Sequence, residues 1–168
     1  MDMKFRIEKK DAFRVVGVVT HTTYENNACM SEVPRFWGGV IQEGKNIEIG
    51  ELMNQKPLGL IGINVYNTDA IDPKKFDYYI ACATDKPIQD GMTEYIVPAA
   101  TWAIFPCKRM ETASVEIRIV TEWQPTSGYE LLNSGYDTGE MRSGAPDLEI
   151  YDDKDNAEVW IAVKKIKE

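Results

Sequence analysis

Glu149-Ile150-Tyr151, a polar turn, and then Ala157-Glu158-Val159-Trp160-Ile161-Ala162 form the stretch that decides the fold, because the chain contains it twice. The earlier copy is Asn64-Val65-Tyr66, a polar turn, and Phe76-Asp77-Tyr78-Tyr79-Ile80-Ala81. The copies align without gaps within each strand, with Asp77 matching Glu158 and Tyr79 matching Trp160. A strand pair that occurs twice predicts a duplicated structural unit.

Side chains alternate between the two faces of a strand, which gives these segments two different surfaces. Glu149 and Tyr151 share one face of their strand, opposite the aliphatic residues beside them. Glu158 and Trp160 alternate in the same way with the aliphatic residues of the next strand. We therefore expect one aliphatic face that packs on helices. The other face combines aromatic rings with carboxylates, which is typical of a ligand cleft.

Other segments complete each copy of the unit. Hydrophobic periodicity and turn residues predict, for the first copy, a strand at 13–23, a helix that Ser31 caps, and strands at 58–66 and 76–83. For the second copy they predict an extended segment at 93–106 with Pro98 at a bulge or edge, a helix that Thr112 caps, and strands at 148–151 and 157–165. Residues 115–119 also alternate like a strand, but the repeat favours a helix there.

The order of elements is strand, helix, strand, strand, and then the same again. This order predicts an α+β fold of duplicated βαββ units, with an antiparallel-rich sheet and two helices on one face. We expect a ligand cleft at the seam between the repeats, on the face away from the helices. Residues 1–168 contain no linker, so we expect a single domain, with repeat one at about 1–88 and repeat two at about 89–168.

Composition narrows the classes of partner. A hydrophobic content of 43% is that of a globular protein, and no apolar run is long enough to span a membrane. The net charge of −8 repels phosphate backbones, so we expect no direct nucleic-acid binding. Three widely spaced cysteines and the lack of an apolar leader segment favour reduced thiols in the cytoplasm.

Glu149 and the aromatic residues are the main candidates for a site. A carboxylate in the middle of a strand either faces solvent or contacts a ligand. Each aromatic ring, taken alone, also fits a position in the hydrophobic core. Ring faces attract cations by roughly 0.5–2 kcal/mol. Together with Glu149 and Glu158, the rings predict a cleft for a lipophilic cation. The aromatic candidates are Trp37, Tyr66, Tyr79, Trp102, Trp123, Tyr151 and Trp160.

Other chemistries have little support in the sequence. His21 is the only histidine, no cysteine or histidine spacing fits zinc, and no glycine-rich loop has the context of a phosphate site. We therefore expect neither a metal nor a cofactor. An acid/base pair of Glu149 with Tyr79 or Tyr151 would allow water addition to a reactive ligand, so an enzyme stays open as the less favoured interpretation.

The chain resembles the GyrI-like small-molecule-binding family over nearly its whole length. This family is the effector-binding domain of AraC- and MerR-type bacterial transcription regulators, and it also occurs as stand-alone proteins. The resemblance rests on Phe13–Gly17, Phe76–Ala81, Val97–Ala99 with Trp102–Phe105, Glu122–Glu130, Leu148–Tyr151 and Glu158–Val163.

The resemblance implies a duplicated βαββ fold with a ligand cleft between the repeats, and recognition of hydrophobic, often cationic compounds. Glu149 matches an acid that projects into this cleft in the family. Asn64 occupies the equivalent position in the first repeat, so only one half supplies an acid there. The residues carried over by position are Glu158, Tyr66, Tyr79, Tyr151, Trp160 and, on the first helix, Trp37.

Three functions follow from the resemblance. We expect a module that binds a small lipophilic cation, as an effector sensor or a sequestering protein. The alternatives are a hydrolase of reactive xenobiotics that uses Glu149 and Tyr151, and a protein-interaction module similar to the gyrase inhibitors of the family. The chain is either stand-alone or joined to a DNA-binding part.

Overall fold

One antiparallel sheet forms the frame of the computed structural model, which describes residues 3–152 and 154–166. Its strand order is β1-β6-β9-β8-β3-β4-β2-β5, and β7 pairs with β9 outside this path. The strands are β1 (Arg6–Lys10), β2 (Phe13–Thr23), β3 (Leu60–Val65), β4 (Lys75–Ala83), β5 (Thr93–Val97), β6 (Ala100–Lys108), β7 (Tyr129–Leu131), β8 (Asp147–Tyr151) and β9 (Asn156–Lys165).

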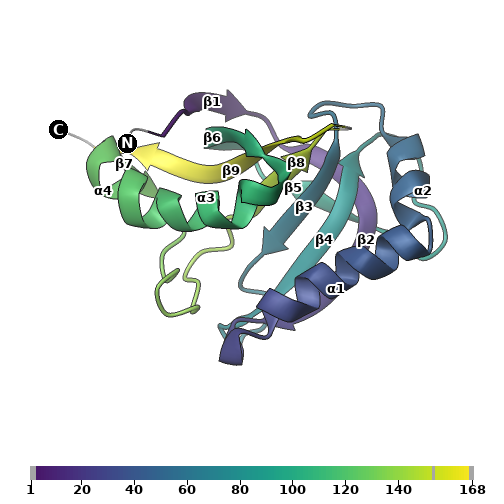
Figure 1. The fold of residues 1–168 in the computed structure, drawn as a ribbon, viewed down its shortest axis with the longest axis horizontal. Helices are drawn as coiled ribbons and strands as arrows, with labels where there is room; N and C mark the ends of the chain where they lie inside the picture. The colour runs from purple at the N-terminus through teal and green to yellow at the C-terminus, as the bar shows by residue number, and fades with distance from the viewer. Residues whose placement is uncertain (1–2, 153, 167–168) are drawn as a thin grey trace.

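The helices of the two halves lie on the same face of this sheet, one group over each half (Figure 1). The helices of the first half are α1 (Cys29–Gln42) and α2 (Lys45–Leu52). The helical segment of the second half consists of α3 (Thr112–Arg118), a π-helical turn (Ile119–Trp123) and α4 (Gln124–Ser127). Short 3₁₀ turns at Glu25–Asn27 and Arg109–Glu111 precede α1 and α3.

The strand order is symmetric about the contact between β3 and β8. Each half contributes a leading strand, a second strand, helices and a hairpin, so the predicted α+β fold of duplicated βαββ units is confirmed. The leading strands are exchanged between the halves: β1 pairs with β6 of the second half, and β5 pairs with β2 of the first. This exchange joins the two halves at both ends of the sheet as well as at its centre.

The core occupies both faces of the sheet. Under α1 and α2, apolar side chains of β2 and β4 such as Val16 and Ile80 are buried, and under α3 Phe105 and Ile161 are buried. On the other face a single cluster joins both halves through residues such as Ile63, Leu148 and Trp102. Glu149 and Tyr151 lie on the helix-bearing face, together with residues of α1 and α3, so the prediction that their face is the one away from the helices is wrong.

Several predicted boundaries also differ from the structure. The extended segment 93–106 is divided at Pro98-Ala99 into β5 and β6, which pair with different neighbours. Helix α1 begins at Cys29, and the Ser31 hydroxyl donates to the Ala28 carbonyl rather than capping the helix. Thr112 is the first residue of α3 and makes no side-chain cap. The strands β1 and β7 and the helix α2 were not predicted.

Among the helices of the described residues, none has the length and apolar character needed to cross a lipid bilayer.

Candidate functional site

A cleft lies on the helix-bearing face of the sheet, between α1 and α3 and above β3, β4 and β8. Its cavity has a volume of about 370 Å³. Figure 1 shows α1 and α3 flanking the central strands that form its floor. The residues that line it include Val33, Pro34 and Trp37 from α1, Thr112, Ala113 and Glu116 from α3, and Asn64, Tyr78, Glu149 and Tyr151 from the sheet.

Glu149 of β8 lies in this floor and accepts hydrogen bonds from two tyrosines. The Tyr151 hydroxyl donates to Glu149 Oε2 at 2.5 Å, and the Tyr78 hydroxyl donates to the same oxygen at 3.4 Å. Trp37 Nε1 donates to the Tyr78 hydroxyl at 2.8 Å, and the Trp37 ring meets the Tyr151 ring edge-on, with centroids 5.4 Å apart. These contacts hold the carboxylate and three aromatic rings as one unit.

A glycine makes room for this arrangement. Gly62 of β3 is directly opposite Glu149 of β8. A Cβ atom at Gly62 would lie 2.2 Å from the Tyr78 hydroxyl oxygen and 3.3 Å from Glu149 Oε2. Since real Cβ atoms do not approach oxygen so closely, the Tyr78 hydroxyl reaches Glu149 only because position 62 lacks a side chain.

Glu116 brings a second carboxyl group to the cleft, from the wall formed by α3. Its Oε1 atom is inaccessible to solvent and has no hydrogen-bond partner in the described part of the chain. Burial, followed by the charge and the side chain of Glu149, raises the pKa of Glu116 well above its usual range. Both causes favour the neutral form of the Glu116 carboxyl group over its charged form.

A third acid, Asp147, is buried at the end of β8, where it is surrounded by tyrosines. The Tyr66 hydroxyl donates to Asp147 Oδ2 at 2.6 Å, and the Tyr136 hydroxyl donates to Oδ1 at 2.7 Å. The Tyr24 and Tyr66 hydroxyls are 3.2 Å apart. Burial raises the pKa of Asp147 to about 6, and the two hydrogen bonds offset only part of this effect.

The structure brings together several of the residues that the sequence analysis predicted for the site. Glu149, Tyr151, Asn64 and Trp37 all line the cleft. Tyr66 is on the same face of the sheet, but it is buried and directs its hydroxyl to Asp147. Whether any of these residues contacts a ligand stays a prediction.

Glu158 and Trp160 do not lie with Glu149, so their expected placement is wrong. Glu149 is paired with Val159, and directly paired residues of neighbouring strands share a face. Glu158 therefore lies opposite Ile150, on the other face of the sheet, where it binds Arg6 at 2.7 Å. The alternation within each strand was predicted correctly, but the register between the strands was not known.

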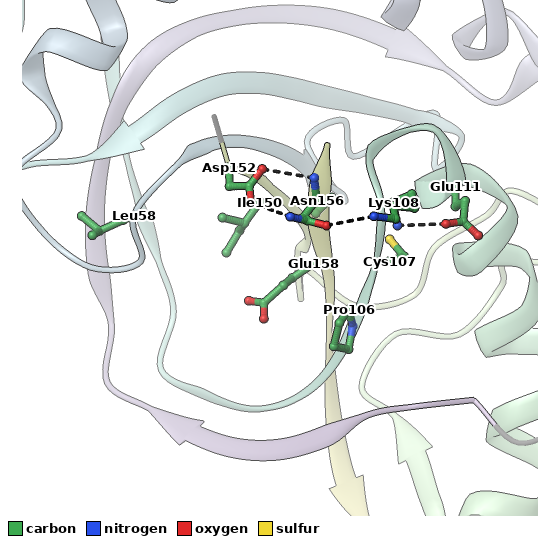
Figure 2. Close-up of a pocket in the computed structure, with 10 residues that line it drawn as sticks. Leu58, Pro106, Cys107, Lys108, Glu111, Ile150, Asp152, Asn156 and Glu158 are labelled. Carbon is green, nitrogen blue, oxygen red and sulfur yellow. Dashed lines mark hydrogen bonds between the residues drawn. The ribbon is translucent and has the colours of Figure 1, made fainter. Parts of the chain in front are cut away.

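Glu158 instead faces a second hollow, of about 520 Å³, together with Ile150 and Pro106 (Figure 2). The polar side chains of this hollow mostly bond to one another: Asn156 Nδ2 donates to Asp152, and Lys108 Nζ lies 3.5 Å from Asn156 Oδ1. This hollow is larger than the cleft between the helices. Its described lining residues include no aromatic ring and no buried carboxyl oxygen without a partner, so we take the smaller cleft as the candidate site.

Three other predicted aromatics also lie away from the cleft. Tyr79 faces the opposite side of the sheet and stacks on Tyr95, with centroids 5.3 Å apart. Trp102 is fully buried beside Trp160 in the core shared by both halves. Trp123 belongs to the π-helical turn of the second half and packs in the core between that turn and the sheet. For these rings the core interpretation is correct.

Three important residues were not predicted, although the sequence holds a signal for each. Tyr78 lies opposite Asn64 in the β3–β4 hairpin, so a correct register would have selected it in place of Tyr79. Asp147 is two residues before Glu149 and therefore shares its face, but it lies one residue before the predicted start of the strand at Leu148. Glu116 lies one turn after Thr112 on α3, next to the apolar stripe.

In the described ranges, no cluster of three or more histidine, cysteine or acidic side chains is arranged to hold a metal ion.

Comparison with known proteins identifies the family of this chain. The model of the integron-associated effector-binding proteins, Cass2, matches residues 6–163. The chain belongs to this family. The predicted kinship with effector-binding domains is thereby confirmed. A search of curated proteins found no significant match.

Solved structures share the fold at low sequence identity. A candidate transcription regulation protein from Staphylococcus aureus MU50 is 17% identical, with a TM-score of 0.74 over 97% of this chain and 99% of its own. SAV2435 bound to tetraphenylphosphonium is 18% identical, with a TM-score of 0.73 over 96% of this chain and 94% of its own. An integron cassette protein of Vibrio cholerae is 15% identical, with a TM-score of 0.63 over 95% of each chain.

Proposed function

We propose that this Cass2-family protein binds a small lipophilic cation in the cleft between α1 and α3, as an effector sensor or a sequestering protein. The observation that carries the proposal is the Glu149 carboxylate on a floor of aromatic rings. Trp37, Tyr78 and Tyr151 surround it, and hydrogen bonds fix the positions of these groups. A carboxylate and ring faces together attract a desolvated cation.

The charge around the cleft supports a cationic ligand. Among the described residues no lysine or arginine lines the cavity, whereas Glu116 and Glu149 both do. A protein of similar fold is bound to tetraphenylphosphonium, which is an aromatic monocation. Because identity with that protein is low, its ligand serves here as a probe compound rather than as the expected natural effector.

Partners and location form part of the same proposal. An effector sensor passes its signal to a DNA-binding partner, whereas the net charge of −8 argues against contact of this chain with DNA itself. The three cysteines are free and two of them are buried, which supports a reducing, cytoplasmic location.

The hydrolase alternative is favoured only by the contact between Tyr151 and Glu149. Burial, and then the charge of Glu149, raise the pKa of Tyr151 above its usual range. A tyrosine that holds its proton so firmly is a poor general acid or base near neutral pH. The same contact suits a fixed binding site, so we favour binding over catalysis.

Calorimetric titration with tetraphenylphosphonium at pH 7.5 tests the proposal. We expect saturable binding by the wild type, at least tenfold weaker binding by Glu149→Gln, and little binding of neutral triphenylphosphine oxide. The tenfold loss corresponds to about 1.4 kcal/mol, within the range of a charge pair at an effective dielectric constant of about 20.

Glu158→Gln is the matched control, because it removes an acid from the neighbouring strand on the opposite face. Its affinity should stay within about twofold of that of the wild type, since charges separated by the sheet and exposed to solvent are screened. Equal losses in both variants would indicate an effect of net charge, and an unchanged affinity in Glu149→Gln would refute the assignment of Glu149.

A further inference from the structure

The cleft contains two acids, one in its floor and one in a wall. Glu149 projects from β8 in the floor, and Glu116 projects from α3 above it; both line the same cavity. The two groups differ in their surroundings. Glu149 accepts hydrogen bonds from two tyrosines, whereas Glu116 Oε1 is buried without a partner in the described part of the chain. The hydroxyl donors of the cleft are therefore directed at Glu149 and not at Glu116 Oε1.

Two carboxyl groups that face one cavity do not both ionise readily where burial limits solvent screening, as it does at Glu116 Oε1, because their negative charges repel. Among the described residues, the other titratable groups that line the cavity or interact with the two acids are neutral or negative: Asp147, Cys29, Cys107, Tyr24, Tyr78, Tyr136 and Tyr151. Arg109 packs on the Tyr151 ring, 5.2 Å from its centroid, but does not line the cavity. No lysine or arginine lines the cavity within the described residues. A proton on the pair is the remaining way to lower this repulsion in the ligand-free protein.

We propose that Glu116 and Glu149 hold one proton between them in the ligand-free cleft, and that a bound cation displaces this proton to solvent. The step breaks one carboxyl O–H bond and forms one O–H or N–H bond on the water or buffer molecule that takes the proton. This inference rests on the proposed function and makes it more specific. It assigns Glu116 the role of coupling cation affinity to pH.

The coupling has a defined sign. A cation near both oxygens favours the charged form of the acid that carries the proton, and so lowers its pKa in the complex. Between the pKa values of the complex and of the free protein, binding releases up to one proton. By linkage, the affinity for a permanent cation then rises with pH, by up to tenfold per pH unit within this interval.

The experiment is calorimetric titration of the full chain with tetraphenylphosphonium, which has no titratable group. It is carried out from pH 5.5 to 8.5, at each pH in two buffers that differ in heat of ionisation. For the wild type we expect release of a fraction of one proton per ligand, and an affinity that rises with pH. For Glu116→Gln we expect retained binding, no proton release and a flat profile that meets the wild-type curve at its acidic end.

Asp147→Asn is the second variant, because Asp147 is the other buried acid near the pair. It should retain the proton release of the wild type. Release that persists in Glu116→Gln and disappears in Asp147→Asn would overturn the assignment to Glu116. Binding by the wild type without proton release at any pH would overturn the shared proton and leave the proposed function intact. A lack of any cation binding would overturn both.

Discussion

The buried side chain of Asp147 connects strand β8 to two other segments of the chain through hydrogen bonds. Its carboxyl group accepts hydrogen bonds from Tyr66 of the segment after β3 and from Tyr136 of the segment before β8. Met141 of the same segment packs in the cluster with Tyr66 and Phe76. The hydrogen bond from Tyr136 to Asp147 and the packing of Met141 therefore hold the segment 132–146 against the end of the sheet. A carboxylate in this place is costly unless it is protonated or well bonded.

We predict that the free-energy cost of burying the ionised Asp147 side chain makes the stability of the protein depend on pH. The pKa of Asp147 is raised to about 6 in the folded protein from an ordinary 3.8. The folded state thus keeps its proton at pH values where the unfolded chain has lost it. As pH rises from about 4 to about 6, the stabilising effect of the protonated form is lost, by roughly 2–3 kcal/mol in total.

Asp147→Asn has nearly the same shape and lacks this titration. The free energy of unfolding of the wild type minus that of Asp147→Asn should fall across pH 4–6 and level off above it. Denaturant unfolding of both proteins at four pH values from 4.5 to 7.5 measures this difference. Parallel pH profiles for the two proteins would contradict the prediction.

The residues of the site could be predicted only in part, for a definite physical reason. Alternation within a strand is fixed by backbone geometry, so the shared face of Glu149 and Tyr151 was readable from the sequence. The register between strands is a tertiary property, and a different register exchanges the faces of all partner residues. Tyr79, Glu158 and Trp160 were placed wrongly for this reason, while Tyr78 was missed.

At the level of elements, α1 contains two consecutive glycines, Gly38 and Gly39. Glycine inside a helix lowers helix stability, so a close approach of the backbone to a neighbour or tight packing on the sheet would be the usual reason for it. The structure shows neither, since a Cβ at either position would have no atom within 4 Å outside the helix itself. Nothing in the structure explains these two glycines.

We predict that Gly38→Ala stabilises the protein without changing the cleft. Alanine exceeds glycine in helix propensity by about 1 kcal/mol, and Gly38 is exposed in the middle of α1. The midpoint of thermal unfolding should rise by a few degrees, with an unchanged affinity for tetraphenylphosphonium.

Gly62→Ala is the control for this substitution, because a Cβ at Gly62 would collide with the Tyr78 hydroxyl. It should lower both stability and affinity. A destabilising effect of Gly38→Ala would show that the backbone of α1 has a constraint that the structure does not reveal.

Helices and strands were predicted correctly where the hydrophobic periodicity is strong. They were missed where pairing with a neighbouring strand determines the conformation. The strand at 13–23 and the stripe Val115, Ile119 and Trp123 of the second helical segment were found from local pattern. The strands β1 and β7 are short edge strands, whose residues are exposed or only partly buried and carry little hydrophobic signal. Their strand conformation comes from hydrogen bonds to β6 and β9, which a local reading of the sequence does not contain.

At the scale of the whole molecule, the duplicated halves depend on each other. The seam pairs β3 with β8 over five positions, and the leading strands β1 and β5 each complete the sheet of the other half. The core on the face away from the helices also contains residues of both halves. The cleft takes one wall from each half, since Trp37 belongs to the first and Glu116 to the second.

This interdependence leads to a prediction about the two repeats as separate fragments, 1–88 and 89–168. Each fragment lacks its exchanged edge strand and exposes half of the shared core, so neither should fold alone. We expect each to show weak near-ultraviolet circular dichroism and no cooperative thermal transition. An equimolar mixture should regain a cooperative transition and bind tetraphenylphosphonium, because the two surfaces complement each other. A fragment that unfolds cooperatively by itself would instead make the repeats two independent domains, and the cleft would then be an interface between domains rather than part of one core.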